Sequence, residues 1–169
     1  MKPKSSLVFY FLLSLIMISG CKDISTELSE VEKNKIIKDV RSVVEEGIIA
    51  ANNHDPDAMM KVHWYSDDYM AVVNGTIIKG WETVHEIVSF VHSNPRNQSF
   101  TIEQQEVDIR ILNNLTALVI AEGKFINVPT KDSTTTEKFA LTLLVEKIDG
   151  TWKKTLTHES WLSADLLTE

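Results

Sequence analysis

The chain carries a histidine and a serine two residues apart near its C-terminal end, in the stretch TWKKTLTHESW of residues 151–161. Polar and apolar residues alternate here as they do in a β-strand, which places every second side chain on the same face. One face then carries Trp152, Lys154, Leu156, His158 and Ser160. Because imidazole titrates near neutral pH, His158 could accept or give a proton in general acid/base chemistry.

Two arrangements of this strand remain open. If the face with Trp152 lines a cavity, the predicted pocket includes Trp152, Leu156, His158 and Ser160. A structural histidine that is hydrogen-bonded near the rim is the alternative for His158. A single β-bulge would exchange the two faces of the strand, and His158 would then lie at a dimer surface.

A second candidate, Glu122, lies in the stretch ALVIAEGKF, where Leu118, Ile120 and Glu122 would share one face of a strand. A carboxylate that continues an apolar row could be buried with a raised pKa, as a general base requires. The other interpretation is that the row emerges into solvent at Glu122, because fully buried glutamates are rare. His158 and Glu122 are therefore the candidate catalytic residues.

Aromatic residues with polar groups occur where a short predicted helix meets the first predicted strand. Trp64 and Tyr69 suit either a core or a ligand pocket, and both are included in the predicted pocket. We predict neither a metal site nor a cofactor. The sequence contains no HExxH arrangement, no glycine-rich phosphate loop and no nucleophile elbow.

The elements that must position these residues follow from periodicity and turn signals. Apolar residues recur at three- and four-residue steps over 27–53 and 81–94, which predicts two amphipathic helices, and Pro56 opens a short helix between them. The dipeptides Asn74-Gly75 and Asp149-Gly150 predict tight hairpin turns.

Four long strand-like stretches follow the last helix, at residues 100–112, 116–128, 138–148 and 151–161. Helices and strands are thus largely segregated along the chain. This order predicts an α+β fold, with about three helices on one face of a curved antiparallel sheet.

The N-terminal segment predicts export and lipid anchoring. Residues 1–20 combine lysines with an apolar run too short for a comfortable transmembrane helix, which is typical of a signal peptide. The stretch ISGC resembles the bacterial lipobox, which implies cleavage before Cys21 and lipidation of its thiol. The alternatives are an uncleaved signal anchor and a signal peptide followed by a cysteine by chance. We expect a lipidated cysteine and tether over 21–32 and a domain over 33–169. Attachment is expected at the cell envelope, on the outer membrane or cell surface.

Composition restricts the class of partner. The 169 residues carry a net charge of -7 and no visible basic patch, which argues against nucleic-acid binding. Cys21 is the only cysteine, so the chain has no internal disulfide and no cysteine nucleophile beyond the lipidation position. A small-molecule ligand and a membrane, reached through the lipid, are the partners that we expect.

Two motifs, together with the order of elements, resemble the SnoaL-like branch of the nuclear transport factor 2-like superfamily. The stretch NNHDPDAMMKVHWYSDDYMAVVNGTIIKG is similar to the family's segment after the first helix, and DGTWKKTLTHES is similar to its closing hairpin. The resemblance covers about residues 33–162. It implies a cone-shaped sheet that wraps a cavity, with the helices on its concave side. It also implies a homodimer formed through the outer sheet face.

Members of this superfamily include isomerases, dehydratases and non-catalytic binding or assembly modules, so the resemblance does not assign an activity. No catalytic set of a known relative maps onto this chain residue by residue. We therefore predict an envelope lipoprotein whose cavity binds a small, partly apolar molecule. The alternatives are a general acid/base isomerase, dehydratase or cyclase that uses the same cavity, and a dimeric assembly module.

Overall fold

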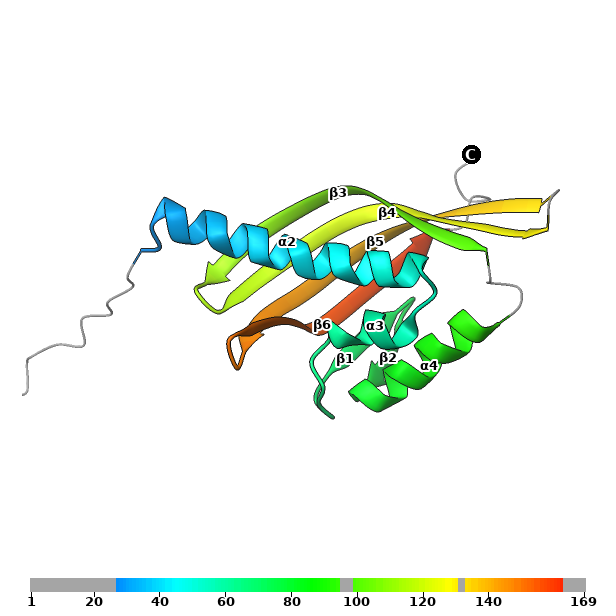
Figure 1. Ribbon diagram of the computed structural model, residues 1–169, viewed down its shortest axis with the longest axis horizontal. Coiled ribbons are helices and arrows are strands. Elements are labelled where there is room, and N and C mark those ends of the chain that lie inside the picture. Colours follow the sequence, from blue (N-terminus) through cyan, green and yellow to red (C-terminus); the bar gives the residue numbers. More distant parts are fainter. Residues whose placement is uncertain (1–26, 95–98, 131–132, 163–169) are drawn as a thin grey trace, which may run out of the picture.

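The computed structural model describes residues 27–94, 99–130 and 133–162. The predicted signal peptide and Cys21, the predicted lipidation position, lie outside these residues. In chain order the elements are α2 (Glu30–Asn52), α3 (Pro56–Lys61), β1 (Met70–Val73), β2 (Thr76–Lys79), α4 (Trp81–Ser93), β3 (Phe100–Asn113), β4 (Thr116–Thr130), β5 (Ser133–Ile148) and β6 (Thr151–Leu162). The predicted α+β architecture is confirmed, with the long helix α2 lying across a curved sheet (Figure 1).

The six strands form one sheet in the order β2-β1-β6-β5-β4-β3. All neighbouring pairs are antiparallel except β1 and β6, which are parallel, so the prediction of a wholly antiparallel sheet is wrong at this pair. Parallel neighbours need a crossover connection, and the chain from β2 to β5 provides one before β6 pairs with β1.

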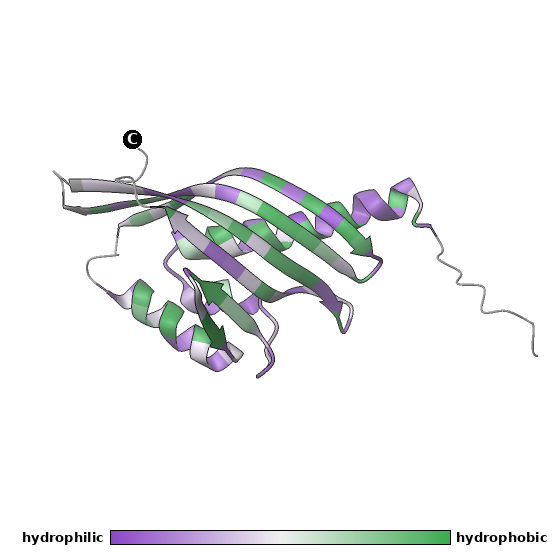
Figure 2. Cartoon of the chain, turned by 180° about the vertical axis from the view of Figure 1, so that it is seen from behind, coloured by the Kyte–Doolittle hydropathy of each residue, from purple (hydrophilic) through white to green (hydrophobic). Residues whose placement is uncertain are grey.

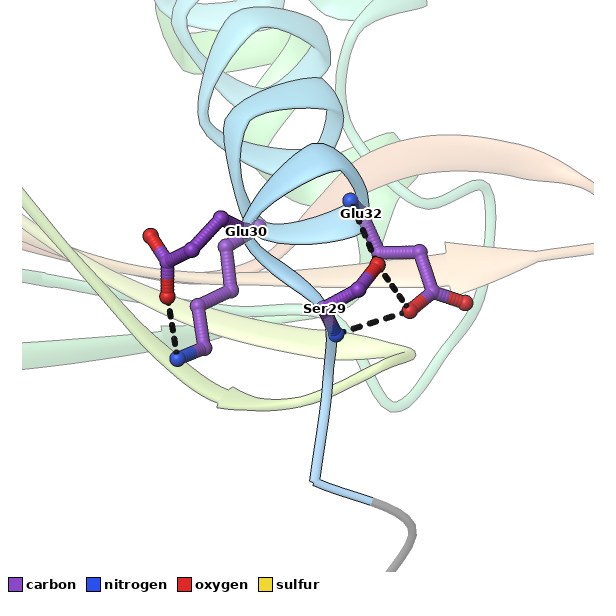
Figure 3. Close-up of polar contacts among 4 residues, drawn as sticks. Ser29, Glu30 and Glu32 are labelled. Atoms are coloured by element: carbon purple, nitrogen blue, oxygen red, sulfur yellow. Dashed lines mark hydrogen bonds and ion pairs between the residues drawn. The ribbon is translucent and has the colours of Figure 1, made fainter.

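The long helix α2 begins at a complete capping box. The Ser29 side chain accepts a hydrogen bond from the Glu32 backbone N–H, and the Glu32 carboxylate accepts one from the Ser29 backbone N–H at 2.9 Å (Figure 3). Both bonds satisfy backbone donors that a helix start otherwise leaves free. Lys33 also pairs with Glu30 at 2.8 Å on the first turn.

The main core lies between α2 and one face of the sheet, which we call the inner face. The buried residues of α2 recur mostly at steps of three or four positions: Ile36, Val40, Val43, Val44, Gly47, Ala50 and Ala51. They pack on the inner-face residues of β4, β5 and β6, which are Ala117, Val119, Ala121, Leu143, Val145 and Trp152. A second, smaller cluster joins α3, β1 and α4 through Met60, Tyr69, Ala71 and Val84.

Both predicted tight turns are confirmed. Asn74 and Gly75 join β1 to β2 with φ of 46° and 84°, and Asp149 and Gly150 join β5 to β6 with φ of 49° and 82°. These left-handed conformations suit glycine and asparagine or aspartate, which is why the dipeptides mark two-residue hairpins. Among the described residues, no helix has the length and apolarity needed to cross a membrane.

A β-bulge in β6 changes which residues face the helices. Leu144 pairs with Leu156 and Val145 pairs with Lys154, so Thr155 is an extra residue on β6. Lys154, Thr155 and Thr157 are all buried, whereas His158 and Ser160 are exposed. The regular alternation that placed Lys154, His158 and Ser160 on one face is therefore wrong beyond Thr155, because one inserted residue moves every later side chain to the opposite face. Of the two arrangements that the sequence left open, the structure has the one with a bulge.

Candidate functional site

The inner face of β6 carries a row of polar side chains beneath the helices. Beyond the bulge, this face presents Thr157, Glu159 and Trp161, and before the bulge it presents Lys154. Thr157 pairs with Ala71 of β1 and Glu159 with Val73, so the row lies at the centre of the sheet between β1 and β5. Burying polar side chains at the centre of a sheet costs free energy, so their presence here points to a role beyond packing.

Lys154 is the most unusual of these residues. It is 7% exposed, and a Cβ added at Gly47 of α2 would lie 2.7 Å from its Nζ, so the amine packs directly against the helix where no side chain intervenes. Burial lowers its pKa to about 8, and the Glu159 charge partly offsets this effect. Among the described residues, no ion pair within 4.0 Å involves Lys154.

Glu159 shows the opposite shift. Burial of its carboxyl group raises its pKa, while a hydrogen bond from Trp161 and the Lys154 charge act in the lowering direction. The Trp161 indole donates to Glu159 Oε2 at 3.3 Å. An acid with a raised pKa and an amine with a lowered one on the same face are the environment-tuned groups expected at functional sites.

Hydrogen-bonded side chains lie at the centre of this polar row on β6. The Tyr69 hydroxyl donates to Thr157 Oγ1 at 3.0 Å, and Tyr69 is 1% exposed. The His63 ring stands edge-on to the Tyr69 ring with centroids 5.3 Å apart, and its Nδ1 donates to the Met59 carbonyl at 3.0 Å. Burial, with a smaller contribution from the Lys154 charge, holds the His63 pKa well below its ordinary value, so this imidazole is neutral.

Aromatic rings continue the inner face beyond Glu159. The Trp161 ring lies 5.3 Å from Phe139 and 5.4 Å from Phe125, and Phe125 stacks on Phe100 at 4.9 Å. Gly123 makes room for this cluster, since a Cβ there would lie 2.5 Å from Phe139 Cζ. We call Phe100, Phe125, Phe139 and Trp161 the aromatic cluster.

Buried polar atoms surround one side of the aromatic cluster. The rings of His54 and His92 stand edge-on to Phe100, with centroids 4.5 Å and 5.2 Å from it. Four buried atoms here have no hydrogen-bond partner within the described parts of the chain: His54 Nδ1, His92 Nδ1, Gln104 Oε1 and Asn127 Oδ1. Orphaned polar atoms beside aromatic rings suit a ligand that is apolar with a few hydrogen-bonding groups.

The structure separates the residues that the sequence singled out. Tyr69 and Trp152 are buried on the inner side, and Trp64 is half-buried with its backbone N–H donating to the Lys154 carbonyl at 2.9 Å. The other four lie on the outer face, the side away from α2: Leu156 half-buried, and Glu122, His158 and Ser160 exposed. Viewed from this side, hydrophobic and hydrophilic residues alternate along the strands (Figure 2).

Sequence reasoning missed Glu159 and Trp161, because it assigned them to the opposite face from Trp152. A usable signal existed only for Lys154, a lysine between the apolar residues Trp152 and Leu156 on the same predicted face. In the ranges that the structure describes, no group of three or more His, Cys, Asp or Glu side chains could hold a metal ion.

The fold and the sequence together define the class of protein. The SnoaL-like domain family matches residues 40–164, and the chain belongs to this family. The sheet and its three covering helices agree with the cone that the family resemblance implied. No match was found among curated proteins.

Solved structures place the chain among nuclear transport factor 2-like proteins. An NTF-2 like protein of unknown function from Shewanella oneidensis MR-1 is 28% identical, with a TM-score of 0.61, over 73% of this chain and 98% of that one. A putative scytalone dehydratase from Novosphingobium aromaticivorans is 11% identical, with a TM-score of 0.70, over 79% and 88%. The hexachlorocyclohexane dehydrochlorinase LinA-type3 from Novosphingobium barchaimii is 17% identical, with a TM-score of 0.66, over 79% and 90%. The last two likenesses show the fold alone.

Proposed function

We propose that the inner face of the sheet binds a small, partly apolar organic molecule. The aromatic cluster would contact its apolar part, and the Glu159 carboxyl would hold its polar group. The observation that carries the proposal is the position of Glu159: a half-buried carboxyl whose pKa desolvation raises, at the edge of the aromatic cluster and held from one side by the Trp161 indole. The family match supports it, since the resemblance to SnoaL-like domains implies a cavity on the concave side of the sheet, where α2 lies.

The chemistry of the face favours a ligand with a hydrogen-bond donor. A carboxyl group and the four orphaned atoms near His54 and Asn127 mostly offer acceptors, and aromatic rings offer flat apolar surface. A hydroxylated or amine-bearing aromatic molecule would satisfy both. Desolvated polar groups then discriminate strongly, because a ligand without the matching donor leaves them unpaired.

The test compares matched variants on the two faces of β6. Native mass spectrometry of the protein, extracted in mild detergent, would show the wild type and His158→Ala carrying a co-purified small molecule. Glu159→Gln should lose it, since the amide removes the charge and one acceptor while keeping the shape. Retention of the molecule by Glu159→Gln together with loss in His158→Ala would contradict the proposal.

A second candidate function is general acid/base catalysis on the same face, as in an isomerase, dehydratase or cyclase. The opposite pKa shifts of Glu159 and Lys154 favour it, because such tuning suits proton transfer near neutral pH. The likeness of the fold to a putative scytalone dehydratase and a dehydrochlorinase agrees with this class of chemistry. Turnover of the co-purified molecule that Glu159→Gln abolishes would favour the enzyme, and binding without turnover would favour the binder.

We further propose that the domain is held at the cell envelope by a lipid on Cys21, on the outer membrane or cell surface. The support is the order of basic residues, apolar run and lipobox-like ISGC over residues 1–21, followed closely by α2 at Glu30. Radioactive fatty acid fed to bacteria that express the full chain should label the wild type and not Cys21→Ser. Equal labelling of both would contradict the anchor.

The outer face is the surface that we propose for a homodimer. Ile120, Thr142, His158 and Val72 occupy adjacent positions on β4, β5, β6 and β1, and Ile120 is 39% exposed. Light scattering should give a dimer for the wild type and a monomer for Ile120→Glu, because like charges would meet across the symmetric contact. A monomeric wild type would contradict this proposal. A dimer without any ligand would instead favour an assembly module.

A further inference from the structure

Exposed apolar side chains occur at the end of the domain where α2 begins. Val31, on the first turn of α2, is 79% exposed, and Leu112 and Leu115, beside the turn from β3 to β4, are 57% and 51% exposed. The start of α2 and this turn lie at the same end of the molecule (Figure 1). Leu28, just before α2, and Ile111, next to Leu112, also pack on the same main core. We call Val31, Leu112 and Leu115 the apolar end.

The chain that precedes α2 limits how far the apolar end can lie from a lipid on Cys21. Cys21 and Ser29, the N-cap of α2, are eight residues apart. A chain of this length spans at most about 29 Å, even when it is fully extended. A lipid on Cys21 would therefore hold the start of α2, and the apolar end with it, close to the membrane surface.

We propose that the apolar end rests on the lipid bilayer that holds Cys21, so that the domain stands with the β3–β4 turn toward the membrane. The inference rests on the lipid anchor proposed above and adds the protein surface that meets the lipid. Exposed apolar side chains that lie together commonly mark a membrane or protein contact. Apolar side chains that enter the interfacial region of a bilayer add to the hold of an acyl anchor.

The charges beside the apolar end do not select anionic lipids. The first turn of α2 carries Glu30 and Glu32, and Lys33 pairs with Glu30 at 2.8 Å. Recognition of anionic lipids needs a cluster of basic residues, which this turn does not provide. The contact should therefore depend on apolar surface and should form on neutral phosphatidylcholine.

This orientation determines where the proposed ligand site would lie relative to the bilayer. β3 begins at Phe100 of the aromatic cluster, and Leu112 lies near its other end. At about 3.3 Å per residue, the two positions are about 40 Å apart along the strand. The aromatic cluster would therefore lie at the end far from the membrane, and its ligand would come from the aqueous phase rather than from the lipid.

Fluorescence quenching tests the contact on the lipidated protein in phosphatidylcholine vesicles that carry a nitroxide near the upper end of one acyl chain. Cys21 is the only cysteine and its thiol would carry the lipid, so an introduced cysteine supplies the only free thiol for a fluorophore. A label at Leu115→Cys should lose about half of its fluorescence, because side chains at the interface reach the depth of the nitroxide. A label at Phe90→Cys, which is 69% exposed and two residues from His92 beside the aromatic cluster, should stay nearly unquenched.

Two further measurements separate this inference from the lipid anchor itself. Mass spectrometry of the N-terminal peptide detects the acyl groups, and flotation shows whether the protein binds the vesicles. An unquenched Leu115→Cys label on an acylated protein that floats would overturn the contact and leave the anchor, as expected if another protein or a second copy covers this end. A protein without acyl groups would overturn both proposals, and equal quenching at both labelled positions would overturn the orientation.

Variants distinguish an apolar contact from closeness to the lipid alone. A label at Val31→Cys should be quenched, and Leu112→Glu should reduce that quenching by about half, because a charged side chain resists entry into the acyl region. Phe90→Glu is the matched control and should leave the quenching unchanged. Both substituted positions are exposed, and circular dichroism checks that each variant is folded. Quenching at Val31→Cys that Leu112→Glu does not alter would overturn the apolar contact.

Discussion

Lys154 and Glu159 lie on the inner face of β6, whereas His158 and Ser160 lie on its outer face, although all four belong to one short strand. The residues whose types most readily suggest catalysis are exposed to solvent. The residues whose pKa values burial shifts are a lysine and a glutamate, Lys154 and Glu159. The comparison shows that environment, rather than residue type, decides which side of this strand is fitted for chemistry.

The two faces also differ in how their polar groups affect the free energy of folding. An exposed histidine or serine is solvated and affects stability little, whereas a buried lysine and a half-buried carboxyl destabilise the fold unless they are fully paired. Sites of this kind commonly trade stability for function. If the inner face of β6 is such a site, its variants should gain stability while losing binding, and outer-face variants should do neither.

The largest change in the free energy of unfolding is expected on β4, where Gly123 faces inward and Glu122 faces outward. Gly123→Val should destabilise the protein by about 3 kcal/mol, because its Cβ would meet Phe139 Cζ and the Glu103 carbonyl at 2.5 Å. Glu122→Ala, the adjacent control, should change the free energy of unfolding by less than about 0.5 kcal/mol. Urea unfolding measures both, and equal effects would show that the two faces are not packed differently.

The next effect concerns Lys154 and depends on pH. Its pKa falls from an ordinary 10.5 to about 8 in the folded protein, so between these values the unfolded chain binds a proton that the folded chain lacks. Wild-type stability should therefore rise relative to Lys154→Met from pH 8 to 10.5, by at most about 3 kcal/mol. Below pH 8 the buried ammonium is a constant cost, and Lys154→Met should be the more stable protein.

Thermal unfolding of both proteins across this pH range checks the sign. Lys153→Met is the control and should run parallel to the wild type, because Lys153 is only half-buried. A wild-type curve that falls relative to Lys154→Met above pH 8 would contradict the burial of the amine.

The smallest effect compares two tyrosines. Tyr69→Phe removes a buried hydrogen bond to Thr157 and leaves that hydroxyl without its donor, so it should cost about 1–2 kcal/mol. Tyr65→Phe removes an exposed bond to Glu82 and should cost less than about 0.5 kcal/mol. Urea midpoints at fixed pH distinguish the two variants. A Tyr69→Phe variant as stable as the wild type would show that the Tyr69 hydroxyl does not stabilise the centre of the inner face.

Local signals in the sequence account for most of the fold. The apolar spacing of α2 and the turns at Asn74-Gly75 and Asp149-Gly150 depend on neighbouring residues only, and these predictions are confirmed. The parallel pairing of β6 with β1 and the bulge at Thr155 depend on partners distant in the sequence. Nothing local to Thr155 distinguishes it from a regular strand residue.

This difference explains why several of the predicted site residues lie on the outer face of the sheet. A bulge moves every later side chain to the other face, so one extra residue, whose presence no local signal marks, exchanged His158 and Ser160 for Thr157 and Glu159. Burial of Lys154 was equally hidden, because it depends on Gly47 leaving room on a helix about a hundred residues earlier. The positions of the elements were predictable, and the direction of individual side chains was not.

Native mass spectrometry of the full-length wild type, Glu159→Gln and His158→Ala would show which face of β6 binds the ligand. We expect a small-molecule adduct on the wild type and on His158→Ala, and its loss from Glu159→Gln with the fold intact. An adduct that survives Glu159→Gln and disappears in His158→Ala would contradict it, and would place the functional face of β6 on the outside of the sheet.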